Sequence, residues 1–173
     1  MDTISSSFYD SPVGTYEVSA DKDGILSIKL ISKEKIEEHE KTMPSSARKH
    51  IQDCLKWMDV YFTDLSKIDK IKPPVLNTAR FRHKKFCCHV WKMLLEELHP
   101  GQTMSYGEVA KLAGNPKAAR AVGMAMKSNP FSIIMPCHRV LSRDGIGNYS
   151  SLNGVTTKRW LLEHENVNME KLH

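Results

Sequence analysis

Alternation of apolar and polar residues marks the first part of the chain as β structure. Apolar side chains occupy positions 26, 28 and 30 of the run Ile25–Leu30, and a strand places every second side chain on one face. The preceding run Gly14–Val18 leads to this strand through a turn that ends in Asp23-Gly24, a pair typical of hairpin turns. The pattern therefore predicts a β-hairpin.

The spacing then changes to that of an amphipathic helix. One apolar stripe recurs every three or four positions, and Ser46 stands where an N-cap would lie; the stripe consists of Ile51, Leu55, Met58 and Phe62. The segment Lys67 to Pro74 is typical of a linker and ends in Pro73-Pro74. We therefore expect two domains, residues 1–76 and 77–173.

The second half is predicted to be mostly helical. A helix that ends at Pro100-Gly101 is indicated by Phe86, Val90, Leu94, Leu95 and Leu98. Ser105 and Glu108 have the spacing of a capping box, which starts a short helix ending at Gly114. Asn115 then fits an N-cap and Pro116 the first turn of an alanine-rich helix, Lys117 to Lys127. Two helices joined by a tight turn predict a helix-turn-helix.

Composition limits the class of protein. The chain has 173 residues, 40% hydrophobic and 26% charged, as in ordinary globular proteins. No apolar run approaches the ~20 residues of a membrane span, and Met1 to Asp10 do not resemble a signal peptide. We expect an intracellular protein with no membrane contact.

Charge divides the chain unevenly. Residues 1–79 contain 11 Lys and Arg against 13 Asp and Glu, and residues 80–173 contain 14 against 7. The second half is therefore strongly basic, which favours a polyanionic partner such as nucleic acid. A basic surface without a partner is the alternative that charge alone leaves open.

Cysteine chemistry points to one position. Cys54, Cys87, Cys88 and Cys137 form no secreted-type framework and no CxxC pair, so no metal site is expected. Cys137 follows an apolar run and Pro136, and His138 comes directly after it. An apolar setting raises the pKa of a thiol, so Cys137 needs a base.

His138 is the candidate base, but neighbours in an extended segment point to opposite sides. We therefore expect a bridging water rather than direct contact between Cys137 and His138. Glu165 shares the helix face of Leu161 and Leu162, and a carboxylate facing a core needs a partner. We expect Glu165 to hold His138, and Asn129 to brace the backbone before Cys137 through a turn.

Taken in order, these motifs resemble the O6-alkylguanine-DNA alkyltransferase family. The similarity runs from about Phe86 to Glu165 and is weaker in the N-terminal half, at Ser11-Pro12-Val13-Gly14 and the hairpin. The matching motifs are Ser105-Tyr106-Gly107-Glu108, the stretch Ala113 to Gly123, Ser128-Asn129-Pro130, Pro136-Cys137-His138-Arg139-Val140, Gly147-Asn148-Tyr149-Ser150 and Trp160-Leu161-Leu162 with His164-Glu165.

The resemblance implies a mixed α/β fold of two domains. The N-terminal one is a small ribonuclease-H-like α/β unit, and the C-terminal one is mostly helical with a winged-helix-like helix-turn-helix. It also implies single-use transfer of an alkyl group from O6-alkylguanine in double-stranded DNA to Cys137. His138 acts as the base through water, Glu165 holds His138, and Asn129 braces the site. No cofactor is implied, and we expect a monomer acting in the nucleus.

The resemblance also assigns substrate contacts. Tyr106 hydrogen-bonds the guanine ring, Ser150 lies near guanine O6, and the alkyl pocket is lined by Val140, Met126 and Tyr149. Arg120 enters the base stack when the damaged nucleotide flips into the minor-groove-bound protein. Further DNA contacts are expected from Asn115, Ala118, Ala119, Ala121, Gly123, Lys127 and Arg143.

Two features depart from the family, and two other functions compete with it. Ser151-Leu152-Asn153 replace a usual Gly-Gly pair, which bears on the alkyl groups accepted, and no cysteine precedes Cys54, so the zinc of some relatives is not expected. A cysteine hydrolase with a Cys137–His138–Glu165 triad is one rival. A DNA-binding lesion sensor or transcription factor is the other.

Overall fold

The chain divides into two compact units, Met1–Thr78 and Ala79–His173. The computed structural model describes residues 4–32 and 45–172. The first unit combines a sheet with helix, and the second is mostly helical, so the predicted fold class is confirmed. The division lies two residues beyond the boundary expected from sequence.

An antiparallel sheet forms one layer of the first unit. Its order is β1–β2–β3, with bounds Ser5–Ser11, Gly14–Asp21 and Gly24–Ile31. Asp21 pairs with Gly24, so the predicted hairpin is correct. Gly24 has a φ of +147°, and a Cβ there would lie 2.7 Å from the carbonyl oxygen of Val75, so no other residue fits this turn.

Strand β1 has no counterpart in the predictions. Its serine-rich sequence lacks apolar alternation. The strand is stabilised instead by pairing with its neighbour β2. Backbone pairing runs along the whole strand from Ser5 to Ser11, and the hydroxyls of Ser6 and Ser19 lie 2.9 Å apart. A polar strand at a sheet edge depends on its partner more than on its own pattern.

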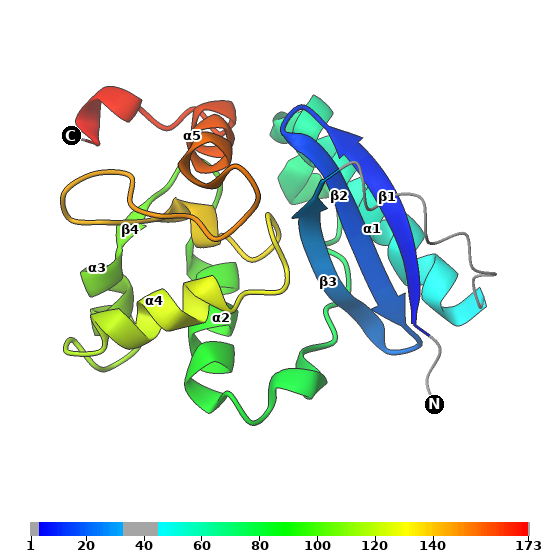
Figure 1. The fold of residues 1–173 in the computed structure, drawn as a ribbon, viewed down its shortest axis with the longest axis horizontal. Helices are drawn as coiled ribbons and strands as arrows, with labels where there is room; N and C mark the ends of the chain where they lie inside the picture. The colour runs from blue at the N-terminus through cyan, green and yellow to red at the C-terminus, as the bar shows by residue number, and fades with distance from the viewer. Residues whose placement is uncertain (1–3, 33–44, 173) are drawn as a thin grey trace. The chain divides into compact units, whose positions relative to one another are not determined.

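Helix α1 (Ser45–Thr63) packs on all three strands (Figure 1). The predicted stripe needs one correction, because Cys54 is buried while Leu55 is only half-buried. Ser46 lies inside the helix rather than before it. The buried face consists of Ala47, Ile51, Cys54, Trp57, Met58, Tyr61 and Phe62.

The segment predicted as a linker belongs to the first unit. Leu65–Lys70 form the 3₁₀ helix η2, with Ile68 buried. Ile25 donates its N–H to the Val75 oxygen and accepts from the Asn77 N–H, both at 2.8 Å. The chain after Pro74 is therefore anchored to β3.

The 3₁₀ helix η3 (Thr78–Phe81) begins at the last residue of the first unit and leads to α2 (Lys85–Glu97) of the second. Trp91 is buried and donates Nε1–H to the Ala125 oxygen at 2.9 Å, which ties α2 to helix α4 (Ala119–Lys127). Leu95, expected in the buried stripe, is 39% exposed. The indole at position 91 occupies the contact face instead.

Helices α3 (Tyr106–Leu112) and α4 (Ala119–Lys127) pack on each other. The capping box is confirmed, since Ser105 Oγ accepts from the Glu108 N–H and the Glu108 carboxylate accepts from the Ser105 N–H. The expected N-cap at Asn115 is wrong. Asn115 forms a turn closed by the Ala118 N–H at 2.9 Å, and α4 starts only at Ala119.

The remaining elements of the second unit are short, apart from the last α-helix. They are β4 (Met104–Ser105), η4 (Cys137–Arg139), β5 (Val140–Leu141), α5 (Gly154–His164) and η5 (Met169–Lys171). Strands β4 and β5 pair in parallel, with Met104 opposite Val140. Over residues 4–32 and 45–172, no helix is long and apolar enough to cross a membrane.

Candidate active site

The backbone that delivers Cys137 is built from two tight turns. Ile134 donates its N–H to the Ser132 oxygen, with Ile133 between them at a φ of 73°, which is the rare γ-turn and strained for a β-branched residue. Cys137 donates its N–H to the Met135 oxygen across Pro136, whose φ of −81° and ψ of 53° form the easy inverse γ-turn. These turns end in η4, so Cys137 and His138 lie in a 3₁₀ turn and not in the extended segment expected.

Cys137 is held by an amide. Its side chain is 6% exposed, and Asn129 Nδ2 donates to Sγ at 3.0 Å and to the Met135 oxygen at 3.2 Å. The other end of that amide, Oδ1, accepts from the Phe131 N–H at 2.8 Å. Asn129 therefore fixes the local backbone and the sulfur together.

The thiol does not ionise readily in this setting. Burial raises the pKa of Cys137, and hydrogen bonds from Asn129 and Tyr149 and the charge of Lys158 offset that only in part. At neutral pH the sulfur is thus a thiol. A group that accepts its proton is required before it can attack.

His138 and Glu165 form a fully buried pair. His138 Nε2 lies 2.7 Å from Glu165 Oε1. Burial lowers the pKa of His138 against the raising effect of Glu165, so the ring is neutral and its one proton sits on Nε2, facing the carboxylate. His138 Nδ1 is then left as a lone pair, buried and without a hydrogen-bond partner among the described residues. A neutral imidazole in this tautomer can act as a base through Nδ1.

Arg139 is a second partner of Glu165 that the sequence reasoning missed. Its Nε donates to Oε2 at 2.7 Å and its Nη2 to Oε1 at 2.8 Å, while Nη1 donates to the Leu98 oxygen at 2.6 Å. Burial alone would raise the pKa of Glu165, but His138 and Arg139 hold it well below its usual range. The carboxylate therefore stays ionised and orients the histidine.

Lys158 was also missed, although the periodicity that placed Glu165 on the buried face of α5 places Lys158 there too. Its side chain is fully buried, and Nζ donates to the Val140 oxygen at 2.7 Å and to the Asn148 oxygen at 3.4 Å. Burial lowers the pKa of Lys158 to about 8. The amine ties the segment after Cys137 to the loop of Tyr149 and Ser150.

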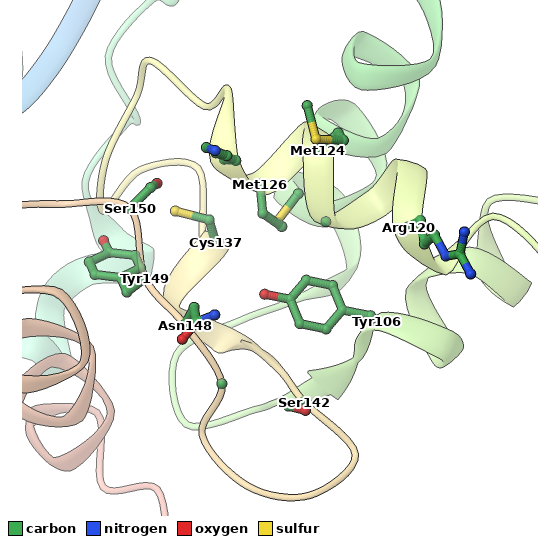
Figure 2. Close-up of a pocket in the computed structure, with 12 residues that line it drawn as sticks. Tyr106, Arg120, Met124, Met126, Cys137, Ser142, Asn148, Tyr149 and Ser150 are labelled. Atoms are coloured by element: carbon green, nitrogen blue, oxygen red, sulfur yellow. The ribbon is translucent and has the colours of Figure 1, made fainter.

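A pocket of about 770 Å³ opens in front of Cys137, within the range of small-molecule sites. Figure 2 shows Tyr106 and Asn148 on one side of it and Met126 on the other. Burial raises the pKa of Tyr106, and a thiolate at Cys137 raises it further, so the Tyr106 hydroxyl stays protonated. The lining residues are Tyr106, Arg120, Gly123, Met124, Met126, Lys127, Cys137, Ser142, Gly147, Asn148, Tyr149 and Ser150.

Not every predicted site residue meets the pocket. Val140 was expected in its wall but is fully buried in β5, because pairing with β4 carries it into the core. Residues 151–153 are also outside the lining; Leu152 accepts from the Thr157 hydroxyl at 2.8 Å, at the start of α5.

The residues expected to contact DNA have different exposures. Asn115, Arg120, Ala121, Lys127 and Arg143 are exposed, while Ala118, Ala119 and Gly123 are half-buried. Asn115 lies in the turn before α4, and Arg143 lies after β5. The remaining ones lie in α4 or at its N-cap. No cluster of three metal-ligating side chains occurs in the part of the chain that the structure describes.

Residues 85–167 match the 6-O-methylguanine DNA methyltransferase DNA binding domain, and residues 4–70 match the ribonuclease-like domain of the same proteins. The latter confirms the expected type of N-terminal domain. The methylated-DNA--protein-cysteine methyltransferase of Homo sapiens is 38% identical over 168 residues, covering 94% of this chain and 80% of the human one. That of Methanosarcina acetivorans is 33% identical over 159 residues, covering 91% and 95%.

Solved structures agree. A crystal structure of Mycobacterium tuberculosis OGT in complex with DNA superimposes with a TM-score of 0.69 at 30% identity, covering 91% of this chain and 90% of that one. The sequence similarity extends over both domains and includes the segment that carries Cys137. The chain therefore belongs to the 6-O-methylguanine DNA methyltransferase family.

Proposed function

We propose that this protein repairs DNA by moving an alkyl group from the O6 atom of guanine to the Sγ atom of Cys137. One observation carries the proposal: a buried, amide-held thiol faces a pocket, and the neighbouring histidine is locked by a carboxylate in the tautomer of a base. Membership of the methyltransferase family supplies the reaction class.

His138 is the proton acceptor in this proposal. Its Nδ1 is buried and has no hydrogen-bond partner among the described residues, and no direct hydrogen bond from Cys137 to His138 occurs among them. A water relays the thiol proton to Nδ1, and the ionised Glu165 stabilises the resulting imidazolium. Asn129 keeps Sγ in place as the charge develops on it.

The covalent step is a displacement at carbon. The Cys137 thiolate forms an S–C bond to the alkyl carbon, the C–O6 bond breaks, and its electron pair goes to the guanine. Tyr106 donates a hydrogen bond to the guanine ring and passes its hydroxyl proton to the departing base, and the proton that His138 took from the Cys137 thiol makes good that loss, so no net proton is gained or lost. Ser150 lies near O6, and Met126 and Tyr149 contact the alkyl group. Since water does not cleave the thioether formed, each molecule acts once.

DNA is held by α4 and the turn that precedes it. The small residues Ala118, Ala119, Ala121 and Gly123 allow close approach of α4 to the minor groove, as the second helix of a helix-turn-helix. Arg120 enters the stack when the damaged nucleotide leaves it, and Asn115, Lys127 and Arg143 contact the backbone. The protein acts as a monomer without a cofactor, and its task places it in the nucleus.

The test follows the alkyl group. Duplex DNA bearing radiolabelled O6-methylguanine is incubated with the protein and with a Cys137→Ser variant. We expect label on the protein at no more than one equivalent, and none on the variant. Catalytic turnover would instead indicate a hydrolase, and lesion binding without transfer would indicate a sensor; either result refutes the proposal.

A further inference from the structure

Helix α4 carries an exposed stripe of three long side chains beside the pocket. Arg120, Met124 and Lys127 are spaced four and three residues apart, so they lie on one helix face, and all three line the pocket mouth. Met124 is 61% exposed, the highest value among the exposed large hydrophobic residues of the described chain. A solitary surface methionine is unremarkable, but this one lies between two cations at the entrance to the reacting thiol.

Met124 differs from Met126, which is only two residues away. Met126 is 5% exposed and points into the pocket toward Cys137, whereas Met124 stands on the rim (Figure 2). A base that reaches Cys137 is therefore touched by Met126. Most of the Met124 side chain is exposed at the pocket edge, so Met124 can also contact a partner that stays outside the pocket.

Under the proposed function, the object outside the pocket is the duplex that the target nucleotide has left. Its departure leaves unstacked base pairs at the rim, and minor-groove proteins fill such gaps with apolar side chains, methionine among them. The flexible thioether adapts to an irregular gap. On one side of Met124 stands Arg120, which in the proposed function enters the stack in place of the nucleotide, and Lys127 on the other side matches a phosphate that borders the gap.

We propose that Met124 is a wedge residue, which packs against the base pair next to the extruded nucleotide and so favours the open duplex. This rests on the proposed function. The wedge acts on extrusion and makes no contact with the alkyl group. Its removal should therefore slow repair of duplex DNA and leave the reaction with a free base unchanged.

The test compares two substrates. Second-order rate constants are measured for duplex DNA containing O6-methylguanine and for free O6-benzylguanine, using wild type, Met124→Gln and Met124→Leu. We expect Met124→Gln to lose about tenfold on the duplex, which corresponds to about 1.4 kcal/mol, and to stay within about twofold on the free base. Met124→Leu should restore most of the duplex rate, because it is apolar.

Leu95→Gln is the matched control, since Leu95 is an exposed apolar residue that does not line the pocket; it should leave both rates unchanged. A 2-aminopurine beside the lesion reports unstacking, and its fluorescence rise should shrink in Met124→Gln.

Equal losses on both substrates would put Met124 in the pocket wall and overturn the wedge. Unchanged rates on both would also overturn it. A wild type that transfers no alkyl group to Cys137 would instead refute the proposed function.

Discussion

Substitution of Glu165 is the strongest test of the buried charge pairs in the site. The side chain of this residue is fully buried, and its carboxylate accepts two hydrogen bonds from Arg139, one from His138 and a longer one, 3.4 Å, from the Gly101 N–H. Glu165→Gln keeps the shape but removes the charge. It also replaces one carboxylate oxygen by an amide N–H₂ group, although His138 and Arg139 both donate hydrogen bonds to this position. One pair of donors must therefore face each other.

The expected loss is large. Removing one member of a buried ion pair costs about 3–5 kcal/mol, because the other charge is left without compensation, and a domain has only about 5–15 kcal/mol in total. The pKa of Glu165 is lowered on folding. The stability that the ionised Glu165 carboxylate gives the folded protein is therefore present above the unfolded pKa of about 4.3, and it disappears as pH falls toward the lower folded pKa. Glu165→Gln should lack this acid dependence.

Urea unfolding measures both effects. Trp57 lies in the first unit, and Trp91 and Trp160 lie in the second. A Trp57→Phe background therefore makes fluorescence report the unit that holds Glu165.

Glu163→Gln is the matched control, since Glu163 is exposed in the last turn of α5 and Glu165 is the C-cap of that helix; it should change the unfolding free energy by less than about 0.5 kcal/mol. The double variant Arg139→Met, Glu165→Gln should lose less unfolding free energy than the sum of the losses of the two single variants, because removing both partners leaves neither charge of the pair buried alone. A loss below about 1 kcal/mol for Glu165→Gln, or equal to that of the control, would refute the argument.

Two further predictions concern charge and burial around thiols. Lys158→Met keeps the buried stem but removes the cation that favours the Cys137 thiolate, so alkylation of Cys137 by iodoacetamide should be slower below pH 8, where Lys158 is charged; an unchanged rate there would mean that the lysine only ties carbonyls together. Burial raises the pKa of Cys54 to about 12, so in a Cys137→Ser variant a thiol reagent at pH 8 should modify the half-buried Cys87 and Cys88 well before Cys54. Equally fast modification of Cys54 in folded protein would contradict its burial in α1.

The periodicity of α5 shows how far sequence reasoning reached into the site. Placing Glu165 on the face of Leu161 and Leu162 correctly indicated a buried carboxylate and led to His138 as its partner. Lys158 occupies the same face one turn before Leu161 and Leu162. Its burial was not predicted because a lysine side chain is almost always exposed to solvent. The two carbonyl groups that accept hydrogen bonds from its amine, those of Val140 and Asn148, lie 18 and 10 positions away along the chain.

Elsewhere, the errors come from packing. The apolar stripes of the first and second long helices each included a leucine that the fold leaves partly or largely exposed, Leu55 and Leu95. Cys54 and Trp91 lie on the buried faces instead. Helical spacing defines a face to within about one residue, and only the neighbouring element decides which side chain lies at its centre.

The order of residues along the chain was enough to predict the local turns and helix caps of this protein. The hairpin turn between Asp21 and Gly24 and the capping box at Ser105 rest on contacts between near neighbours, and such contacts follow from residue type and spacing. The order Pro136-Cys137-His138 indicated a nucleophile with its base, but not the 3₁₀ turn that carries them. The family resemblance rests on the same motifs.

Tertiary structure decided what lies between distant segments. Arg139 and Glu165 are 26 positions apart in the sequence, and Trp91 and Ala125 are 34 positions apart. Residue spacing along the chain does not predict that either pair forms a hydrogen bond. The lone pair on His138 Nδ1 and the lowered pKa of Lys158 depend on burial. Burial is set by the assembled elements, because desolvation and charge act through space and not along the chain.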